Sequence, residues 1–532
     1  MRKAILYISA LLLMVSCNDY LETKPKSFVT PEFYYRNESE LTAALMGVYS
    51  ELGNTNESTY SRFLSLEAPS SNDEQLRRGA NTAIIADLYN TSASYDNFFN
   101  CWTTLYSGIQ RANLLLKNID KAVASQSIKD NIRGEALFLR AYYHFILVGY
   151  WGDVPLKLAS TNSVNHVNVA KTSSSEVYSK IMEDMALAFN LVDDSFALGN
   201  VGRVSKNAIS GILARVYLHA AGRLKNPSFY NQARSLTQEI IQSDKYSLNP
   251  DYKQIFINHT ANIYDLKESL WEVEFFFDNS SSSSNEHERF GSTIGIRNRD
   301  NKTGFAQGNY TATGLLFDLY REGDKRRDWN IAPFYYLDND KNNGTAEYLP
   351  NYKWGRYVAK WRREYQTGVY NKNFGGVNWP LLRYADVLLM FAEAENEVNN
   401  GPTADAYNAI NQVRRRAYGF PVNQANTITD LPPGLNKDTF FKWVKDERSR
   451  ELAFEGLRKL DLLRWGLLES TMQEMITIIN STAPGGSQNP LGYSGRDATL
   501  RPYQNFTSRD VVFPIPTQEM SLNRLITQNT GW

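Results

Sequence analysis

Neither sign of charge is in excess in this chain of 532 residues. Lysine and arginine together number 57, aspartate and glutamate together also number 57, and the formal net charge is zero. No block of basic residues interrupts this balance. A neutral chain without basic blocks gains little from the phosphate backbone of a nucleic acid, so the composition argues against nucleic acid as a partner.

Catalytic signatures are also lacking. The five histidines are scattered and none belongs to an HExxH pair, and the chain has no glycine-rich phosphate loop and no GxSxG nucleophile elbow. His287 could be a metal ligand, but a solvated loop histidine is the simpler interpretation. We therefore expect no cofactor, no metal and no enzyme, although a loop-rich hydrolase is the rival that these absences leave open.

No apolar run of the mature chain is long enough to span a bilayer. The run from Ala4 to Val15 is far shorter than the roughly 20 residues that a membrane-spanning helix needs, and two basic residues precede it. We interpret residues 1–16 as a signal peptide. It ends in Met14-Val15-Ser16-Cys17, which resembles a bacterial lipobox. We expect cleavage before Cys17 and acylation of that residue; a plain secretory signal is the alternative.

Cysteine is nearly absent, and this bears on how the exported chain is stabilised. Once Cys17 is lipidated, Cys101 is the one cysteine left and has no partner. An exported protein without a disulfide must rely on packing. Residues 17–35 are polar, contain two prolines and are interpreted as a lipidated leash. We expect residues 36–532 to form a single body attached to it.

Helical periodicity dominates this body. In residues 176–192 the apolar side chains recur at steps of three to four, which is one face of a helix. Residues 208–248 read as a helical hairpin, residues 384–417 as a second, and residues 135–150 pair with 176–192 as a third. Large and small side chains packed across antiparallel helices are the logic of tetratricopeptide repeats. The predicted fold class is all-α, built from degenerate hairpins of this kind.

Three stretches break the helical pattern, at about 55–95, 275–380 and 481–510. They are rich in Asn, Gly, Ser and aromatic residues. Long loops inside a compact protein are usually functional or disordered. Aromatic faces beside amides and hydroxyls suit sugar rings, although loop aromatics also anchor excursions to the core.

Carboxylates recur at i, i+4 in Glu447, Glu451 and Glu455, interleaved with arginines. A glycosidase needs two carboxylates that face one another across a cleft. Carboxylates on one helical stripe are better interpreted as ionised structural partners of the arginines at 448, 450, 458 and 464. The same interpretation applies to Glu393, Glu395 and Glu397.

Five stretches in order resemble the SusD/RagB family of nutrient-binding lipoproteins. They are EALFLRAYYHFILVGYWGDVPL at 135–156, WPLLRYADVLLMFAEAENE at 379–397, AYNAINQVRRRA at 406–417, KDERSRELAFEGLRKLDLLRWG at 445–466, and FPIPTQEMSLNRLITQNTGW at 513–532. With the lipobox at Cys17, the pattern covers the chain from end to end. Each motif alone is modest, but five in this order are highly specific.

This resemblance implies about four tetratricopeptide-like units and a loop-rich region that carries the ligand. It also implies lipid anchoring on the outer face of the outer membrane and a SusC-like TonB-dependent transporter as partner. Oligosaccharides are the expected ligands, with peptides or glycoproteins, as in RagB-like relatives, as the alternative. A purely structural repeat scaffold is a further rival.

Two loop regions of glycan-binding relatives match the chain at 72–79 and at about 290–310. The predicted ligand-binding residues in them are Asn72, Asp73, Arg77, Arg78, Phe290, Arg297 and Tyr310. Where tryptophans are expected the chain has Arg77 and Arg78. Arginine offers a planar fork of donors, which favours a ligand with a carboxylate or many hydroxyls over starch. The aromatic stretch 348–361, with Trp354 and Trp361, is the alternative location.

Overall fold

The computed structural model describes residues 34–53, 57–69, 71–78, 84–161, 163, 167–194, 202–277, 287–300, 304–337, 344–348, 352–368, 371–486 and 493–532. The predicted signal peptide and Cys17 lie outside these residues. Within them, no helix is both long and apolar enough to cross a bilayer.

The three helical hairpins predicted from the sequence are present. They are α4 (Gln126–Trp151) with α5 (Ser174–Leu191), α7 (Lys206–Arg223) with α8 (Phe229–Gln242), and α13 (Tyr384–Val398) with α14 (Ala404–Tyr418). Polar caps set where α5, α7 and α14 begin, because Ser173, Ser205 and Thr403 each accept a hydrogen bond from the backbone N–H three residues on. The prediction of a mainly helical fold is confirmed.

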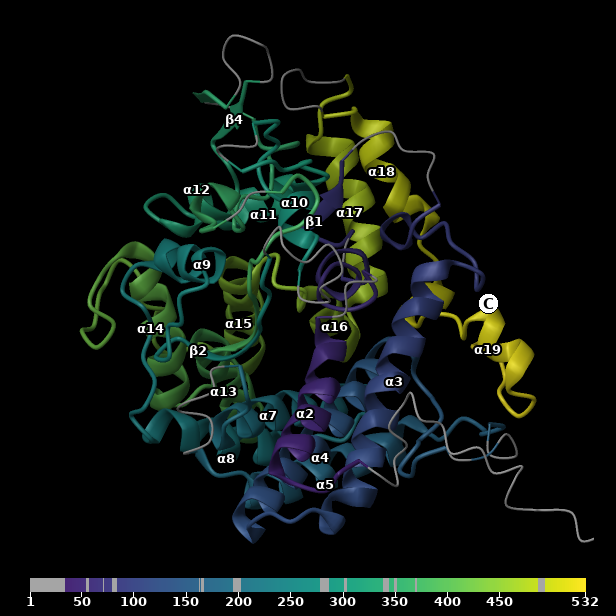
Figure 1. Cartoon of the computed structure of the whole chain (residues 1–532). Helices are drawn as coiled ribbons and strands as arrows, with labels where there is room; N and C mark the ends of the chain where they lie inside the picture. Colours follow the sequence, from purple (N-terminus) through teal and green to yellow (C-terminus); the bar gives the residue numbers. More distant parts are fainter. Residues whose placement is uncertain are drawn as a thin grey trace, which may run out of the picture.

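The remaining helices extend this scaffold (Figure 1). The longer ones are α2 (Glu38–Tyr49), α3 (Asp96–Asn118), α9 (Tyr252–Ala261), α15 (Lys437–Leu452), α17 (Leu468–Thr482) and α18 (Arg496–Asn505). The short ones are α10 (Phe290–Thr293), α11 (Gly314–Leu319), α12 (Arg326–Asn330), α16 (Arg458–Arg464) and α19 (Thr517–Leu522). Single 3₁₀ or π turns lie at Ser50–Leu52, Phe63–Glu67, Ala86–Leu88, Ile119–Lys121, Arg363–Tyr365 and Ser508–Val511.

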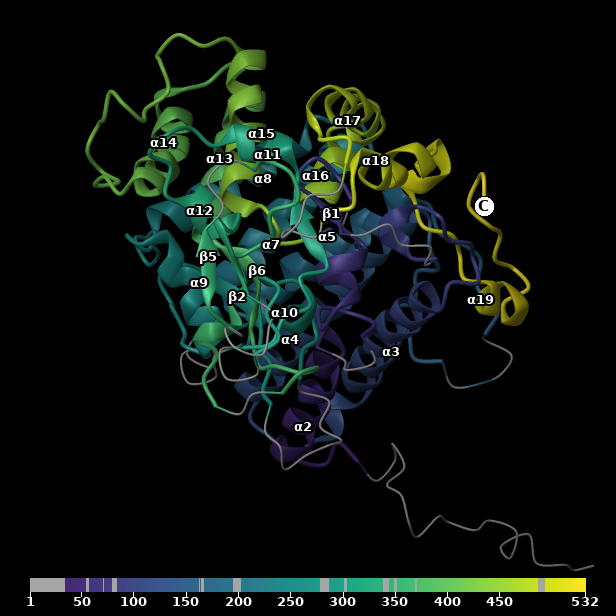
Figure 2. The ribbon, with the colours of Figure 1, turned by 90° about the horizontal axis from the view of Figure 1, so that it is seen from above.

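Buried ion pairs join the helices of the lower half in Figure 1. Arg140 on α4 pairs with Asp184 on α5 at 2.6 Å, and it also donates to Asn113 on α3 at 2.9 Å. Viewed from above, α13 to α15 gather at one edge of the molecule and α17 with α18 at another (Figure 2). One continuous apolar core runs beneath most of these helices.

The structure also contains short strands, inside and beside the long insertions, that the all-helical prediction did not include. Three antiparallel pairs form: β1 (Gln75–Arg77) with β3 (Tyr310–Ala312), β2 (Ser269–Val273) with β6 (Trp379–Arg383), and β4 (Phe334–Tyr336) with β5 (Ala346–Tyr348). The β1–β3 pair joins residues more than 230 positions apart, with Arg77 opposite Tyr310. It therefore brings the two predicted ligand-binding loop regions together.

Candidate ligand-binding site

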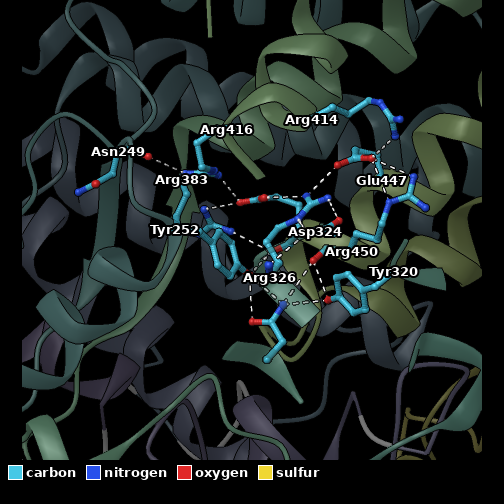
Figure 3. Close-up of polar contacts among 12 residues, drawn as sticks. Asn249, Tyr252, Tyr320, Asp324, Arg326, Arg383, Arg414, Arg416, Glu447 and Arg450 are labelled. Atoms are coloured by element: carbon cyan, nitrogen blue, oxygen red, sulfur yellow. Dashed lines mark hydrogen bonds and ion pairs between the residues drawn. The ribbon is translucent and has the colours of Figure 1, made fainter. Parts of the chain in front are cut away.

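The carboxylates singled out on α15 are held in a buried ion network (Figure 3). The Arg326 guanidinium donates to Glu447 at 2.7 Å and to Glu451 at 3.1 Å, while its other edge binds Asp324. Burial by itself would raise the pKa of Glu451, but Arg416, Arg383 and Arg326 outweigh it and lower that pKa to about 2. The prediction that these carboxylates are ionised structural partners is confirmed.

The predicted partners of these carboxylates were wrong in part. Of the four interleaved arginines only Arg450 binds the stripe, at Glu447. Arg448 binds Asp386 and Asp461, because it lies next to Glu447 on α15 and neighbouring positions on a helix point in different directions. Arg464 lies at the end of a different helix, α16, where it binds Glu393 and Asp461. Glu455 lies beyond the end of α15, where it binds Arg383 and Lys360. The other two carboxylates of the 393–397 group are also paired, Glu395 with Arg234 and Glu397 with Lys437.

Asn72 and Asp73 are buried and engaged by the protein itself. The Asn72 amide closes a turn, donating to the Pro69 carbonyl at 2.8 Å and accepting from the Glu74 N–H at 2.8 Å. Asp73 forms an ion pair with Arg458 at 2.6 Å. Both side chains shape the start of β1, so neither presents its polar atoms to a ligand.

Phe290 and Tyr310 do not offer the stacking faces expected of them, since both are fully buried. Phe290 packs edge-on against Trp361 and Trp379. The Tyr310 hydroxyl donates to Asp87 at 2.6 Å, and Arg77 binds the same carboxylate at 3.3 Å. The physical reason is that the loop aromatics of this region form the core on which the loops rest.

The two tryptophans of the alternative location at 348–361 are buried in the same way, whereas Tyr348 at its start is 72% exposed. Trp361 is fully buried and stacks on Trp379 with ring centroids 5.1 Å apart, and Trp354 is 2% exposed. Gly314 lies so close to the Trp354 indole that a side chain there would collide with it. Neither tryptophan has a face open to a ligand.

Arg78 and Arg297, by contrast, line one open pocket of about 560 Å³. The other residues of its wall are Arg299, Phe305, Ala306, Gln307 and Lys372. The Arg78 backbone N–H donates to the Asn309 carbonyl at 2.7 Å, which extends the β1–β3 pairing to the mouth of the pocket. Strand pairing therefore assembles this site from segments far apart in the chain.

The buried Tyr357 holds the guanidinium groups of Arg78 and Arg297 in position. Arg78 donates to the Tyr357 hydroxyl at 2.8 Å, with its guanidinium 5.4 Å from the centre of that ring. Arg297 also donates to this hydroxyl. Gly308, with φ of +61°, lets the loop approach closely, since a side chain there would meet both Arg297 and Tyr357. Burial raises the pKa of Tyr357, so the phenol stays neutral.

Arg363 links the segment at Phe305 to the segment at 371–374 through hydrogen bonds. It is 3% exposed and donates to the carbonyls of Phe305 at 2.8 Å, Asn371 at 2.9 Å and Phe374 at 2.8 Å. Two segments of the wall are also joined to each other, because the backbones of Asn298 and Ala306 exchange two hydrogen bonds of 2.9 Å. These contacts hold the pocket in shape without a ligand.

Five residues of this wall were missed by the sequence prediction: Arg299, Phe305, Ala306, Gln307 and Lys372. The alternation of side chains along an extended segment could have identified Arg299, because Arg297 and Arg299 flank the buried Asn298 and so point to the same side. Phe305 and Gln307 lie inside the predicted range 290–310. Lys372 comes from a distant segment, and no local pattern indicates it.

Comparison with known proteins identifies the family to which this architecture belongs. Residues 267–532 match the model of the SusD family. The chain belongs to the SusD family. A second model, described as "Starch-binding associating with outer membrane", matches residues 19–218. Arg78 lies in the region 19–218, and the other residues of the pocket wall lie in the region 267–532. The pocket of this SusD-family chain therefore forms where the two matched regions meet.

Individual SusD-like proteins match over nearly the whole chain. "SusD-like protein P25" of Formosa agariphila is 25% identical, covering 99% of this chain and 97% of the relative. The crystal structure of a SusD homolog from Bacteroides thetaiotaomicron is 29% identical with a TM-score of 0.84, covering 96% of this chain and all of that one. A "laminarin binding SusD-like protein" shares the fold at 23% identity with a TM-score of 0.69, covering 94% of this chain and 100% of that chain.

Proposed function

We propose that this protein binds oligosaccharides at the surface of the outer membrane, and that the pocket lined by Arg78, Arg297 and Phe305 is where they bind. The family model described as starch-binding and associated with the outer membrane supports this. Solved relatives are named as laminarin-binding or surface glycan-binding proteins. The pocket itself carries the proposal, because an open hollow with one ring and several fixed polar groups suits a sugar.

Each part of the wall has a task in this binding. The partly exposed Phe305 ring can lie against the C–H face of a sugar, and the Gln307 amide can both donate and accept. The guanidinium groups of Arg78 and Arg297 donate to hydroxyl or carboxylate oxygens. Each hydrogen bond to the ligand takes the place of a hydrogen bond to water, so it gains only about 0.5–1.5 kcal/mol. The affinity therefore depends on several such hydrogen bonds together.

The test is calorimetric titration of the purified chain with oligosaccharides. Replacing Phe305 by Ala should lower affinity roughly tenfold or somewhat more, which corresponds to about 1–2 kcal/mol for one stacking ring. Phe276→Ala is the matched control, because Phe276 is a phenylalanine that is 54% exposed and lies outside the pocket. Equal losses in both variants would contradict the placement of the site.

We propose binding without turnover. The buried carboxylates of α15 are ion-paired with arginines, so they do not form the facing pair that glycoside hydrolysis uses. Incubating the purified chain with the oligosaccharide that it binds should release no new reducing ends. Turnover that survives purification to homogeneity would assign the protein to the hydrolases instead.

We further propose that acylated Cys17 anchors the protein and that it passes its ligand to a SusC-like TonB-dependent transporter. The lipobox-like sequence and the family membership support both steps. Affinity purification of the tagged protein from outer membranes should recover a large β-barrel as the main partner. Recovery of no such barrel from gently solubilised membranes would argue against delivery through this route.

A further inference from the structure

Among the residues that the structure describes, the wall of the ligand pocket has four positively charged side chains and no carboxylate. Arg78, Arg297, Arg299 and Lys372 are the cations, and the rest of the wall is one phenylalanine, one alanine and one glutamine. The whole chain has equal numbers of acidic and basic residues. A cluster of one sign in a neutral protein creates a local positive potential that attracts anions.

Other hollows in the described residues contain carboxylates beside their cations. A pocket of about 530 Å³ beside Trp329 has Lys253, Lys325, Arg362 and Arg416, but Asp251 and Asp328 line it as well. The hollow at the start of α7 combines Arg203 and Lys245 with Asp194, Asp265 and Glu272. The hollow beside Trp465 contains Glu397 next to its cations. The ligand pocket differs from these three in having cations alone.

The structure also fixes part of this positive charge in place. The contact of Arg78 with Tyr357 orients the guanidinium through a neutral phenol, so this anchor does not neutralise its charge. Arg363 holds both walls at a fixed separation through three backbone carbonyls. Donors that are already oriented lose little freedom when a ligand binds.

We infer that the protein selects acidic glycans, in which the sugar carries a carboxylate or a sulfate ester, over neutral ones. This rests on the proposed function and names the class of oligosaccharide. A guanidinium binds either anion with two parallel hydrogen bonds. The Phe305 ring stacks on the sugar, while Arg299 and Lys372, both exposed at the rim, meet the anionic groups.

Matched pairs of probes test this inference. One pair is an oligogalacturonate and its methyl ester, which keeps the sugar ring and removes the charge. The other is a sulfated carrageenan oligosaccharide and its desulfated form. Calorimetry at low salt should show at least tenfold tighter binding of the charged member in one pair, and the pair that responds distinguishes carboxylate from sulfate. Raising the ionic strength should weaken that binding, because the rim charges are exposed to solvent.

A double variant locates the effect. Arg299→Gln/Lys372→Gln removes two exposed cations from the rim and should weaken binding of the charged probe about tenfold to a hundredfold while changing a neutral probe little. Lys253→Gln/Lys325→Gln is the matched control. It removes the same charge from the exposed rim of the pocket beside Trp329, which contains both cations and carboxylates, and should leave binding unchanged.

The outcomes separate this inference from the proposed function. Equal affinity for the charged and uncharged members of both pairs overturns the selection for acidic glycans and leaves glycan binding intact. Equal loss in the two double variants also overturns it, because the effect would then come from net charge rather than this pocket. Binding of no oligosaccharide of any kind overturns both.

Discussion

Arg326 is the residue whose loss we expect to cost most stability. Its guanidinium is 1% exposed and binds Asp324, Glu447 and Glu451 at once (Figure 3). Arg326→Gln would leave these buried carboxylates short of positive charge, which typically costs about 3–5 kcal/mol. The adjacent Arg327 pairs with Asp328 at the surface, so Arg327→Gln should cost about 1 kcal/mol or less. Thermal unfolding of both variants measures the difference, and similar losses would contradict a structural role specific to Arg326.

Glu288 should make stability fall as the pH rises. Burial raises its pKa from 4.5 to about 7, against the opposing effect of Arg363. Between these values the carboxyl ionises in the unfolded chain but stays protonated in the folded one, so stability declines from about pH 4.5 to about pH 7 and is then level. Glu288→Gln should remove this loss and stabilise the protein at pH 8 by about 3 kcal/mol or less.

Denaturant unfolding at pH 5 and pH 8 measures the effect of Glu288→Gln. The two proteins should differ little at pH 5. Glu474→Gln is the control, since Glu474 lies exposed on α17 and its replacement should not change the pH profile. A gain for Glu288→Gln that is as large at pH 5 as at pH 8 would show that packing, not ionisation, is responsible.

At the scale of residues, burial distinguishes the predicted donors from the predicted rings. Arg78 and Arg297 line the open pocket, whereas Phe290 and Tyr310 are part of the core. The partly exposed ring of the pocket wall is Phe305, and the Lys372 ammonium lies 5.2 Å from its centre. No local pattern distinguishes a loop aromatic that anchors the loop from one that faces solvent.

Close helix packing gives a prediction for α3 and α4. A side chain on Gly108 of α3 would lie 2.4 Å from the buried Tyr143 ring of α4. Gly108→Ala should therefore destabilise the protein by about 1–3 kcal/mol. Gly149 on α4 meets Leu460 at an ordinary 3.6 Å, so Gly149→Ala should be neutral or stabilising by up to about 1 kcal/mol. A melting-temperature gain in the first variant would contradict the packing described.

At the scale of elements, the hairpins could be predicted because each is local. The apolar spacing and turn residues of α7–α8 and of α13–α14 lie within about 45 residues of sequence, and the caps are visible as Ser205 and Thr403. The strand pairs could not be predicted in this way, because β1 and β3 are three residues each and pair across more than 230 positions of sequence. Such short segments carry no periodic signal of their own.

In the molecule as a whole, the helical scaffold and the candidate ligand pocket are built from different parts of the chain. The motifs that reveal the family lie in helices and ion networks, whereas the pocket is built by loops that those helices support. Variants of the scaffold such as Arg326→Gln should lower the melting temperature without a selective loss of ligand. Variants of the pocket wall should weaken ligand binding and leave the melting temperature unchanged. A ligand at a hundred times its dissociation constant adds about 2.7 kcal/mol of stability, so a thermal shift with the bound oligosaccharide separates the two classes.

We propose that the attachment of this molecule to the membrane depends on one residue. The apolar segment before Cys17 is too short to span a bilayer, and two or more acyl chains hold a protein on a membrane stably. Cys17→Ala should therefore move the protein from the membrane fraction to the soluble one. Cys101→Ala is the matched control: Cys101 is buried within α3, so its loss should leave anchoring unchanged. Fractionation with protease treatment of intact cells measures both, and a Cys17→Ala variant that stays membrane-bound and protease-accessible would show that another element anchors the protein.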